Sequence, residues 1–226
     1  MKIAVLGTGT VGQALAGRLA ELGHEVAVGT RDVAATMARI EPDGMGNPAY
    51  AVWARSHPQV RLATFAGAAA GAELIVNATS GTAAMDVLTA AGREHLAGKV
   101  LLDIGNPLDF SAGFPPTLFI KDTDSLGERI QREFPELKVV KSLNTMNANL
   151  MVHPKQLADG EHTAFVSGND ADAKRTVIGL LESFGHTDVI DLGDITTARG
   201  AEMILPIWLR LMGALNTPTF NFKIVR

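Results

Sequence analysis

MKIAVLGTGTVGQALAGRLAELGHEVAVGTRD, residues 1–32, is the stretch that decides the fold. Residues 2–6 form an apolar run typical of a buried parallel strand, and they lead directly into a G-x-G-x-x-G pattern. Apolar residues then recur at three- and four-residue spacing as far as Leu22, which predicts an amphipathic helix ending near Gly23. Residues 25–29 predict a second strand. The unit is therefore strand, helix, strand, the context in which this glycine pattern indicates a dinucleotide-binding turn.

The glycine pattern gives each of its three glycines a separate expected role. These roles are a tight turn, room for a pyrophosphate, and close packing of the helix on the strand. The pattern alone would suit a turn that binds nothing, but the flanking strand and helix favour a dinucleotide whose phosphates lie on the helix N-terminal amides. The cofactor contacts expected here are Gly7, Thr8, Gly9, Thr10, Val11 and Gly12.

The end of the second strand selects between the two nicotinamide cofactors. An NAD enzyme usually places a carboxylate there to bind the ribose 2′-hydroxyl, whereas this chain has Thr30 and Arg31. A guanidinium can bind a 2′-phosphate through charge-assisted hydrogen bonds, and a threonine hydroxyl can add another, so NADP is favoured. Asp32 could instead be the missing ribose ligand; we prefer to interpret it as the N-cap of a helix over residues 33–40.

Composition restricts the class of protein. The 226 residues carry a net charge of −4 without long runs of either sign, which gives no basic face for nucleic acid. Cysteine is absent, which excludes disulfides, thiol catalysis and thiolate metal sites. Neither an N-terminal signal nor an apolar span of about twenty residues is evident, so we expect a cytoplasmic protein without membrane attachment.

Strands and helices alternate along the whole chain. This rhythm predicts an α/β fold, a Rossmann-like, doubly wound and mainly parallel sheet. No linker separates the last third, so residues 1–226 are expected to form one domain in which the part from about 137 completes the sheet and the cleft. Residues 108–124 are expected to form a loop, and Pro206 should kink the final helix. The further strands are predicted at residues 60–63, 73–78, 100–104, 137–142, 163–167 and 187–192.

Polar, uncharged residues follow three of these strands. Because the carboxyl ends of parallel strands meet at one edge of the sheet, we expect them to converge on the cofactor. Each could also be an ordinary turn residue, since asparagine and proline favour turns. The candidates are Asn77, Ala78, Thr79 and Ser80, then Asn106 and Pro107, and then Asn144, Thr145 and Met146.

The chain offers no evident catalytic acid, base, nucleophile or metal site. Its six histidines form no metal-type pair, and each is interpreted as a surface or turn residue. Lys141 and Lys174 are poor candidates for a general acid, because one lies in a predicted strand and the other on a helix exterior. Hydride transfer between a nicotinamide and another ring needs mainly positioning, so no catalytic residue is assigned.

These features together resemble the family of F420-dependent NADP reductases, and also the cytosolic NADPH-binding domains of six-transmembrane ferric reductases. The resemblance covers nearly the full length and implies a Rossmann-like domain with extra C-terminal strands and a terminal helix, hydride exchange between NADP and coenzyme F420 or a flavin, and a homodimer. Archaeal members carry a histidine-containing segment after the sixth strand, where this chain has residues 142–146. The resemblance rests on residues 7–12, Thr30 and Arg31, the uncharged strand ends, Arg199 to Glu202, Leu205, Pro206, and Phe222 to Ile224.

Two other functions remain as alternatives. A non-catalytic NADP-sensing module would share every cofactor residue but would have no room for a second ring beside the nicotinamide. An NADPH-dependent reductase of a small carbonyl or imine normally has a large helical C-terminal domain, for which about thirty residues after the last strand are too few. In the leading hypothesis the partner of the protein is therefore a small redox molecule.

Overall fold

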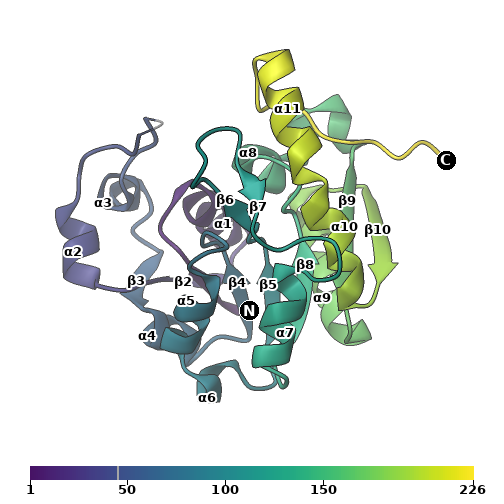
Figure 1. The fold of residues 1–226 in the computed structure, drawn as a ribbon. Coiled ribbons are helices and arrows are strands. Elements are labelled where there is room, and N and C mark those ends of the chain that lie inside the picture. Colours follow the sequence, from purple (N-terminus) through teal and green to yellow (C-terminus); the bar gives the residue numbers. More distant parts are fainter. Residues whose placement is uncertain (45) are drawn as a thin grey trace.

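A computed structural model describes residues 1–44 and 46–226 (Figure 1). Its main sheet has eight strands in the order β10-β9-β8-β5-β4-β1-β2-β3. Every neighbouring pair is parallel except β8 and β9, which are antiparallel, so the predicted mainly parallel Rossmann-like sheet is confirmed. The strands are β1 (Lys2–Leu6), β2 (Glu25–Thr30), β3 (Arg61–Thr64), β4 (Leu74–Asn77), β5 (Val100–Asp103), β8 (Lys138–Ser142), β9 (Thr163–Gly168) and β10 (Asp188–Gly193).

Helices cover both faces of this sheet. Alternate residues of each strand point to opposite faces: Ile3 and Val5 of β1 belong to one apolar core, and Ala4 and Leu6 belong to the other. The first core is completed by α1, α8 and α9, and the second by α4, α5 and α7. The helices are α1 (Thr10–Glu21), α2 (Val33–Ala38), α3 (Tyr50–Trp53), α4 (Phe65–Ala69), α5 (Ala84–Ala91), α6 (Arg93–Leu96), α7 (Leu126–Glu133), α8 (Ala148–Val152), α9 (Ala171–Phe184), α10 (Ala198–Met203) and α11 (Leu205–Leu215).

The N-terminal unit forms as the sequence predicts. β1 pairs with β2 in parallel, and α1 crosses between them. Gly23 has a φ of 82° and donates its amide to the Ala20 carbonyl, which ends the helix. The Asp32 carboxylate accepts the Ala35 amide at 2.9 Å, so its interpretation as the N-cap of α2 is confirmed.

The break at Pro206 is also confirmed. α10 ends at Met203, and α11 starts at Leu205 with the proline in its first turn. A proline is tolerated at that position because the first amides of a helix have no intrahelical acceptor. α11 stands at one end of the molecule, and the C-terminal segment leaves it as extended chain (Figure 1).

Two expectations are wrong. The stretch predicted as a loop contains a small antiparallel hairpin of β6 (Leu108–Asp109) and β7 (Thr117–Leu118), whose strands are too short to show any periodicity in sequence. His162 and His186, expected at the surface, are each only 3% exposed, and their rings meet edge to face at 5.9 Å between centroids. Their burial is compensated because each imidazole donates its Nε2–H to a backbone carbonyl, His162 to Pro154 and His186 to Met151.

Candidate functional site

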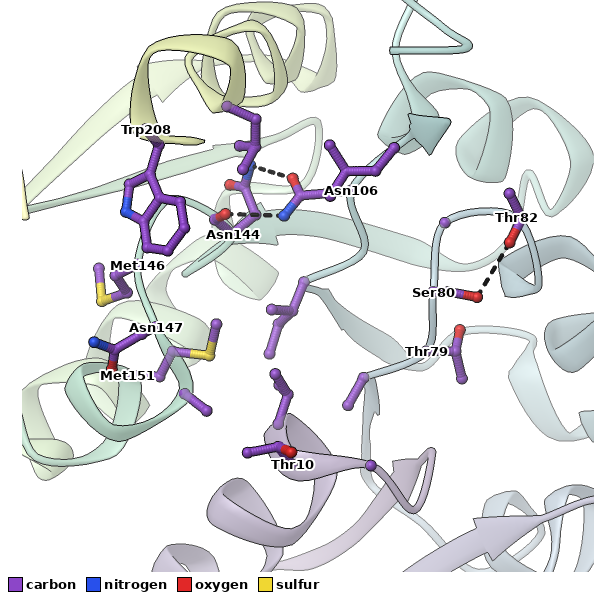
Figure 2. A pocket seen from close by; sticks show the side chains of 18 of the residues that line it. Thr10, Thr79, Ser80, Thr82, Asn106, Asn144, Met146, Asn147, Met151 and Trp208 are labelled. Atoms are coloured by element: carbon purple, nitrogen blue, oxygen red, sulfur yellow. Dashed lines mark hydrogen bonds between the residues drawn. The ribbon is translucent and has the colours of Figure 1, made fainter. Parts of the chain in front are cut away.

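A cavity of about 790 Å³ lies at the carboxyl ends of β1, β4, β5 and β8 (Figure 2). This is the edge at which open α/β sheets bind ligands, and the volume is within the usual range for small-molecule sites. α11 and α8, which packs against α1, also line the cavity, together with the β6 strand. The lining includes nine of the predicted contact residues, namely Gly9, Thr10, Val11, Ala78, Thr79, Ser80, Asn106, Asn144 and Met146.

The other predicted residues lie behind or beside the cavity. Asn77 and Thr145 are buried, with exposures of 0% and 2%, and Pro107 is also buried. Thr30 and Arg31 lie at the end of β2 and do not line the cavity. The glycine-turn residues that do not line it are Gly7, Thr8 and Gly12.

The three glycines of the turn have different surroundings. Gly7 has a φ of +123°, and a Cβ added there would lie 2.6 Å from the Ala78 carbonyl oxygen. A Cβ on Gly12 would lie 2.1 Å from the Gly7 carbonyl oxygen, so the helix can approach the turn only because Gly12 has no side chain. A Cβ on Gly9 would meet nothing within 4 Å. The middle glycine therefore leaves space in front of the helix, which fits a pyrophosphate.

The N-terminus of α1 is chemically suited to an anion. No side chain caps it, and no acidic residue lies in its first turn. Its first amides and the helix dipole therefore present positive partial charge toward the cavity. Gln13 fixes the turn from behind by donating to the Thr8 carbonyl at 2.9 Å and to the Pro48 carbonyl at 3.1 Å.

Thr30 and Arg31 differ in how far their polar groups are already engaged within the protein. The Thr30 hydroxyl is buried and lies 2.7 Å from the Thr36 hydroxyl, which itself donates to the Asp32 carbonyl. Because the Thr36 proton is used, Thr30 must donate to Thr36, which leaves only its acceptor lone pairs for another group. Arg31 is exposed, and none of the ion pairs within residues 1–44 and 46–226 involves it.

The ends of β5 and β8 are joined by a pair of asparagines. Asn106 donates its amide to the Asn144 carbonyl, and Asn144 donates to the Asn106 side-chain oxygen, both at 3.0 Å. Asn144 also donates to the Ala201 carbonyl of α10 at 2.9 Å. Figure 2 shows this pair at the wall of the cavity. These hydrogen bonds connect two strand ends with the C-terminal helices that close the site.

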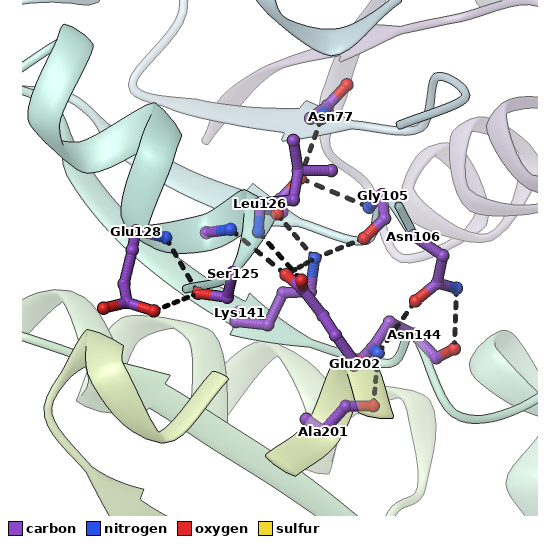
Figure 3. Close-up of polar contacts among 12 residues, drawn as sticks. Asn77, Gly105, Asn106, Ser125, Leu126, Glu128, Lys141, Asn144, Ala201 and Glu202 are labelled. Atoms are coloured by element: carbon purple, nitrogen blue, oxygen red, sulfur yellow. Dashed lines mark hydrogen bonds and ion pairs between the residues drawn. The ribbon is translucent and has the colours of Figure 1, made fainter. Parts of the chain in front are cut away.

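Beneath the cavity lies an ionic cluster that the sequence reasoning missed (Figure 3). The Lys141 ammonium lies 2.8 Å from an Asp103 oxygen and 2.9 Å from a Glu202 oxygen, and the exposures of the three side chains are 0%, 0% and 1%. Burial alone would lower the pKa of Lys141, but the two carboxylates raise it above its usual value, so the side chain is charged. The sequence does contain a sign of this cluster, because Asp103 and Lys141 are charged residues within the apolar runs that form β5 and β8.

The wall formed by α8 and α11 is apolar and aromatic. Trp208 lines the cavity, and its ring stacks on Phe220 with centroids 5.1 Å apart. Met146 and Met151 lie below it in Figure 2, and Leu205 and Leu209 complete the wall. Such a surface fits the face of a planar ring.

Little acid–base chemistry is available at the lining. The lining residues include Asp43 and Asp109 but no histidine, lysine or arginine among those that the structure describes. Hydrogen bonds from Ser111, its backbone amide first, lower the pKa of Asp109, which therefore stays ionised and is a poor proton donor. In the described part of the chain no group of three or more histidine or carboxylate side chains is placed to hold a metal ion. No described helix is both long and apolar enough to cross a membrane.

Comparison with known proteins places this geometry in a family. Residues 2–107 match the family model described as NADP oxidoreductase, coenzyme F420-dependent. The F420-dependent NADP reductase of Methanothermobacter marburgensis is 31% identical over 215 residues, which is 93% of this chain and 92% of that protein. A crystal structure from Arthrobacter sp. FB24, assigned provisionally to the same reductases, is 65% identical over the full length of both chains, with a TM-score of 0.95.

A more distant relative belongs to a larger protein. Metalloreductase STEAP3 of Rattus norvegicus is 28% identical over 96% of this chain, which spans 38% of the length of that relative. The confirmed resemblance therefore includes both of the expected groups, and this chain matches nearly the whole length of the F420-dependent NADP reductase but only part of the metalloreductase. On this evidence the chain is an NADP-dependent oxidoreductase that belongs to the F420-dependent NADP reductase family.

Proposed function

We propose that this protein transfers a hydride between NADP(H) and a deazaflavin, coenzyme F420, or a flavin-type acceptor. The observation that carries the proposal is the cavity itself, which extends from the N-terminus of α1 to the apolar face of Trp208. A site for a dinucleotide alone would not need this second wall. The same observation disfavours a purely sensing module, for which we expect a closed cleft.

The proposed cofactor contacts divide into two groups. Gly9, Thr10 and Val11 hold the pyrophosphate through backbone amides, because the open position at Gly9 and the uncapped helix provide space and positive potential. Arg31 binds the 2′-phosphate from outside the cavity, and Thr30 contributes through the shape of the β2 end, since its proton is donated to Thr36. NADP is the cofactor that this arrangement fits.

The remaining lining residues orient the two rings. Ala78, Thr79 and Ser80 on one side, and Asn106 and Asn144 on the other, offer uncharged polar groups at the strand ends. When bound, the nicotinamide supplies the hydride chemistry, and the protein contributes alignment and exclusion of water. Met146 and Trp208 present the apolar surface against which the second ring packs.

The relatives support a deazaflavin as that second ring. The archaeal relatives that match most of the chain are named F420-dependent NADP reductases. The fungal reductive aminase and imine reductase structures share only the fold, at 18% to 19% identity, and this chain covers 62% of their length. A small carbonyl or imine substrate has no comparable support.

A panel of acceptors tests the proposal. Purified protein is mixed with NADPH and, in separate assays, with F420, FMN, FAD and a small ketone, and NADPH oxidation is followed at a fixed wavelength. We expect turnover with F420 or a flavin and none with the ketone. Turnover with the ketone alone would favour the carbonyl reductase, and tight NADPH binding without any turnover would favour the sensor.

We also propose that the protein works as a cytoplasmic homodimer. Ile207 and Leu215 of α11 are 50% and 53% exposed, and a helix this apolar is usually covered. Light scattering on the purified protein should give twice the mass of the chain. The mass of a single chain would contradict the proposal.

A further inference from the structure

We propose that Lys141, Asp103 and Glu202 are positioning residues, which fix the wall that carries Trp208 relative to the strand ends that face it. The inference rests on the proposed function, because the two sides it joins are the proposed sites of the two rings. The cluster itself does not line the cavity.

Every polar atom of the three side chains is engaged, and the contacts reach several elements of the fold. The Lys141 ammonium donates to Asp103, to Glu202 and to the Gly105 carbonyl. Asp103 accepts the Asn77 side-chain amide at 2.7 Å and the Gly105 backbone amide at 3.2 Å. The cluster thereby joins the ends of β4, β5 and β8 within one hydrogen-bonded network.

Glu202 connects this network to the C-terminal helices. Its carboxylate accepts the backbone amides of Leu126 at 2.8 Å and Gly127 at 3.1 Å, at the N-terminus of α7. Figure 3 shows Glu202 reaching from its helix to Lys141 and to these amides. The carboxylate thus fixes α10 between a strand and a helix terminus.

The network leads to residues that line the cavity on two sides, through Asn77 and Gly105 at the strand ends and through Glu202 in α10. The Asn77 oxygen accepts the Thr79 hydroxyl at 2.6 Å, and Gly105 directly precedes Asn106. On the other side, Glu202 lies three residues before Leu205 and six before Trp208. A displacement of Glu202 would therefore move the apolar wall relative to both strand ends.

Stability alone does not account for such a cluster. Removing three charged side chains from water carries a large desolvation cost, and well-packed neutral replacements of buried ion pairs are often as stable or more so. A buried network that is fully satisfied instead specifies one arrangement of the elements it joins. Because these elements carry the two faces of the cavity, the arrangement it specifies is the separation of the two rings.

Two variants test the inference, each in a Trp53→Phe background so that Trp208 is the only indole. Glu202→Gln keeps the size of the side chain but supplies a single acceptor oxygen, so either the bond from Leu126 is lost or the bonds from Lys141 and Gly127 are lost. The charge-free triple variant Asp103→Asn, Lys141→Met, Glu202→Gln leaves no charge uncompensated. The matched control is Arg199→Gln, which breaks the more exposed ion pair between α10 and Glu128 of α7.

The readouts are single-turnover hydride transfer to F420 or FMN, the Kd of NADPH, and energy transfer from Trp208 to bound NADPH. We expect both test variants to lose about tenfold in hydride-transfer rate and to change the energy transfer from Trp208. The NADPH Kd should stay within twofold of the wild-type value, because the glycine turn is formed by β1 and α1, which contain none of the cluster residues. The triple variant should unfold at or above the wild-type temperature, and Arg199→Gln should match the wild type in all three readouts.

A triple variant with the wild-type rate and energy transfer would overturn the inference. A triple variant that does not fold would also overturn it, because the charges would then hold the fold rather than the wall. If the wild type transfers hydride to no acceptor, the proposed function fails, and the energy-transfer comparison still decides whether the cluster positions Trp208.

Discussion

Gly9 and Gly12 lie in the same turn, yet a methyl group at each position would meet different surroundings. The Gly12 position is in contact with the Gly7 carbonyl, whereas the Gly9 position faces space beside the helix N-terminus. The G-x-G-x-x-G pattern predicts a separate role for each glycine, and the surroundings of these two positions fit the predicted roles. The structure separates a glycine needed for folding from one needed for the ligand.

We predict that Gly12→Ala and Gly9→Ala affect different properties of the protein. Gly12→Ala should destabilise the fold by about 3 kcal/mol, because the new Cβ overlaps a backbone oxygen. Gly9→Ala should leave the free energy of unfolding unchanged but weaken NADPH binding by about tenfold or more, about 1.4 kcal/mol. Urea unfolding and NADPH titration of both variants check this, and a Gly9→Ala protein with wild-type affinity would place the phosphates elsewhere.

Arg31 is the residue on which the selection of NADP rests. Because the guanidinium is exposed and free of ion pairs among the described residues, Arg31→Ala should remove only its bond to the 2′-phosphate. We expect NADPH binding to weaken by about 1 to 3 kcal/mol, the usual range for a charged hydrogen bond, with NADH binding nearly unchanged.

Calorimetric titration with each cofactor measures the effect of Arg31→Ala. Arg175→Ala on α9, far along the chain from β2, controls for the loss of one positive charge. Equal losses of affinity for NADPH and NADH in the Arg31 variant would contradict the selection argument.

At the scale of elements, the junction of α8, α9 and β10 contains a buried titratable group. Burial lowers the pKa of His186 to about 4 from 6.5, against the opposing effect of its hydrogen bond with the Met151 carbonyl. The folded state therefore keeps this imidazole neutral at pH values at which the unfolded chain binds a proton. Above pH 6.5 the imidazole is neutral in both the folded and the unfolded chain, and its full contribution to the free energy of unfolding is present. As the pH falls from 6.5 toward 4, the unfolded chain binds a proton that the folded chain does not, and this contribution is lost.

We predict that the free energy of unfolding decreases by roughly 3 kcal/mol through His186 over that interval. His186→Gln keeps a donor for the Met151 carbonyl but cannot titrate, so its stability should depend less on pH. His95→Gln, at a partly exposed position on α6, is the matched control and should behave like the wild type. Parallel pH profiles for wild type and His186→Gln would contradict the prediction.

Most elements were predictable because their patterns are local. The apolar strands, the capping Asp32 and the break at Pro206 depend on neighbours in sequence, and each forms as expected. The buried histidines and the Lys141 cluster depend on groups brought together from distant segments. A charged residue in a strand does not reveal its partner. The polar strand ends were therefore predictable, but the ion pairs of Lys141 that connect them were not.

At the scale of the whole molecule, β8, β9 and β10 extend the sheet begun by the N-terminal half. We predict that residues 1–226 unfold as a single cooperative unit, because the cores on both sheet faces draw on both halves of the chain. Trp53→Phe and Trp208→Phe each leave one indole, and the two indoles lie in opposite halves of the chain. Their fluorescence transitions in urea should coincide with each other and with the loss of helicity. Separate midpoints would indicate two domains.

In the proposed reaction, a hydride passes directly from NADPH to a second ring held against the Trp208 wall. The most direct measurement uses NADPH deuterated at one or the other prochiral position of nicotinamide C4, with oxidised F420 as acceptor and mass spectrometry of the product. We predict that deuterium from only one of the two isomers appears in reduced F420, because the site presents one face of each ring. Absence of deuterium in the product from both isomers, or equal incorporation from the two, would contradict it.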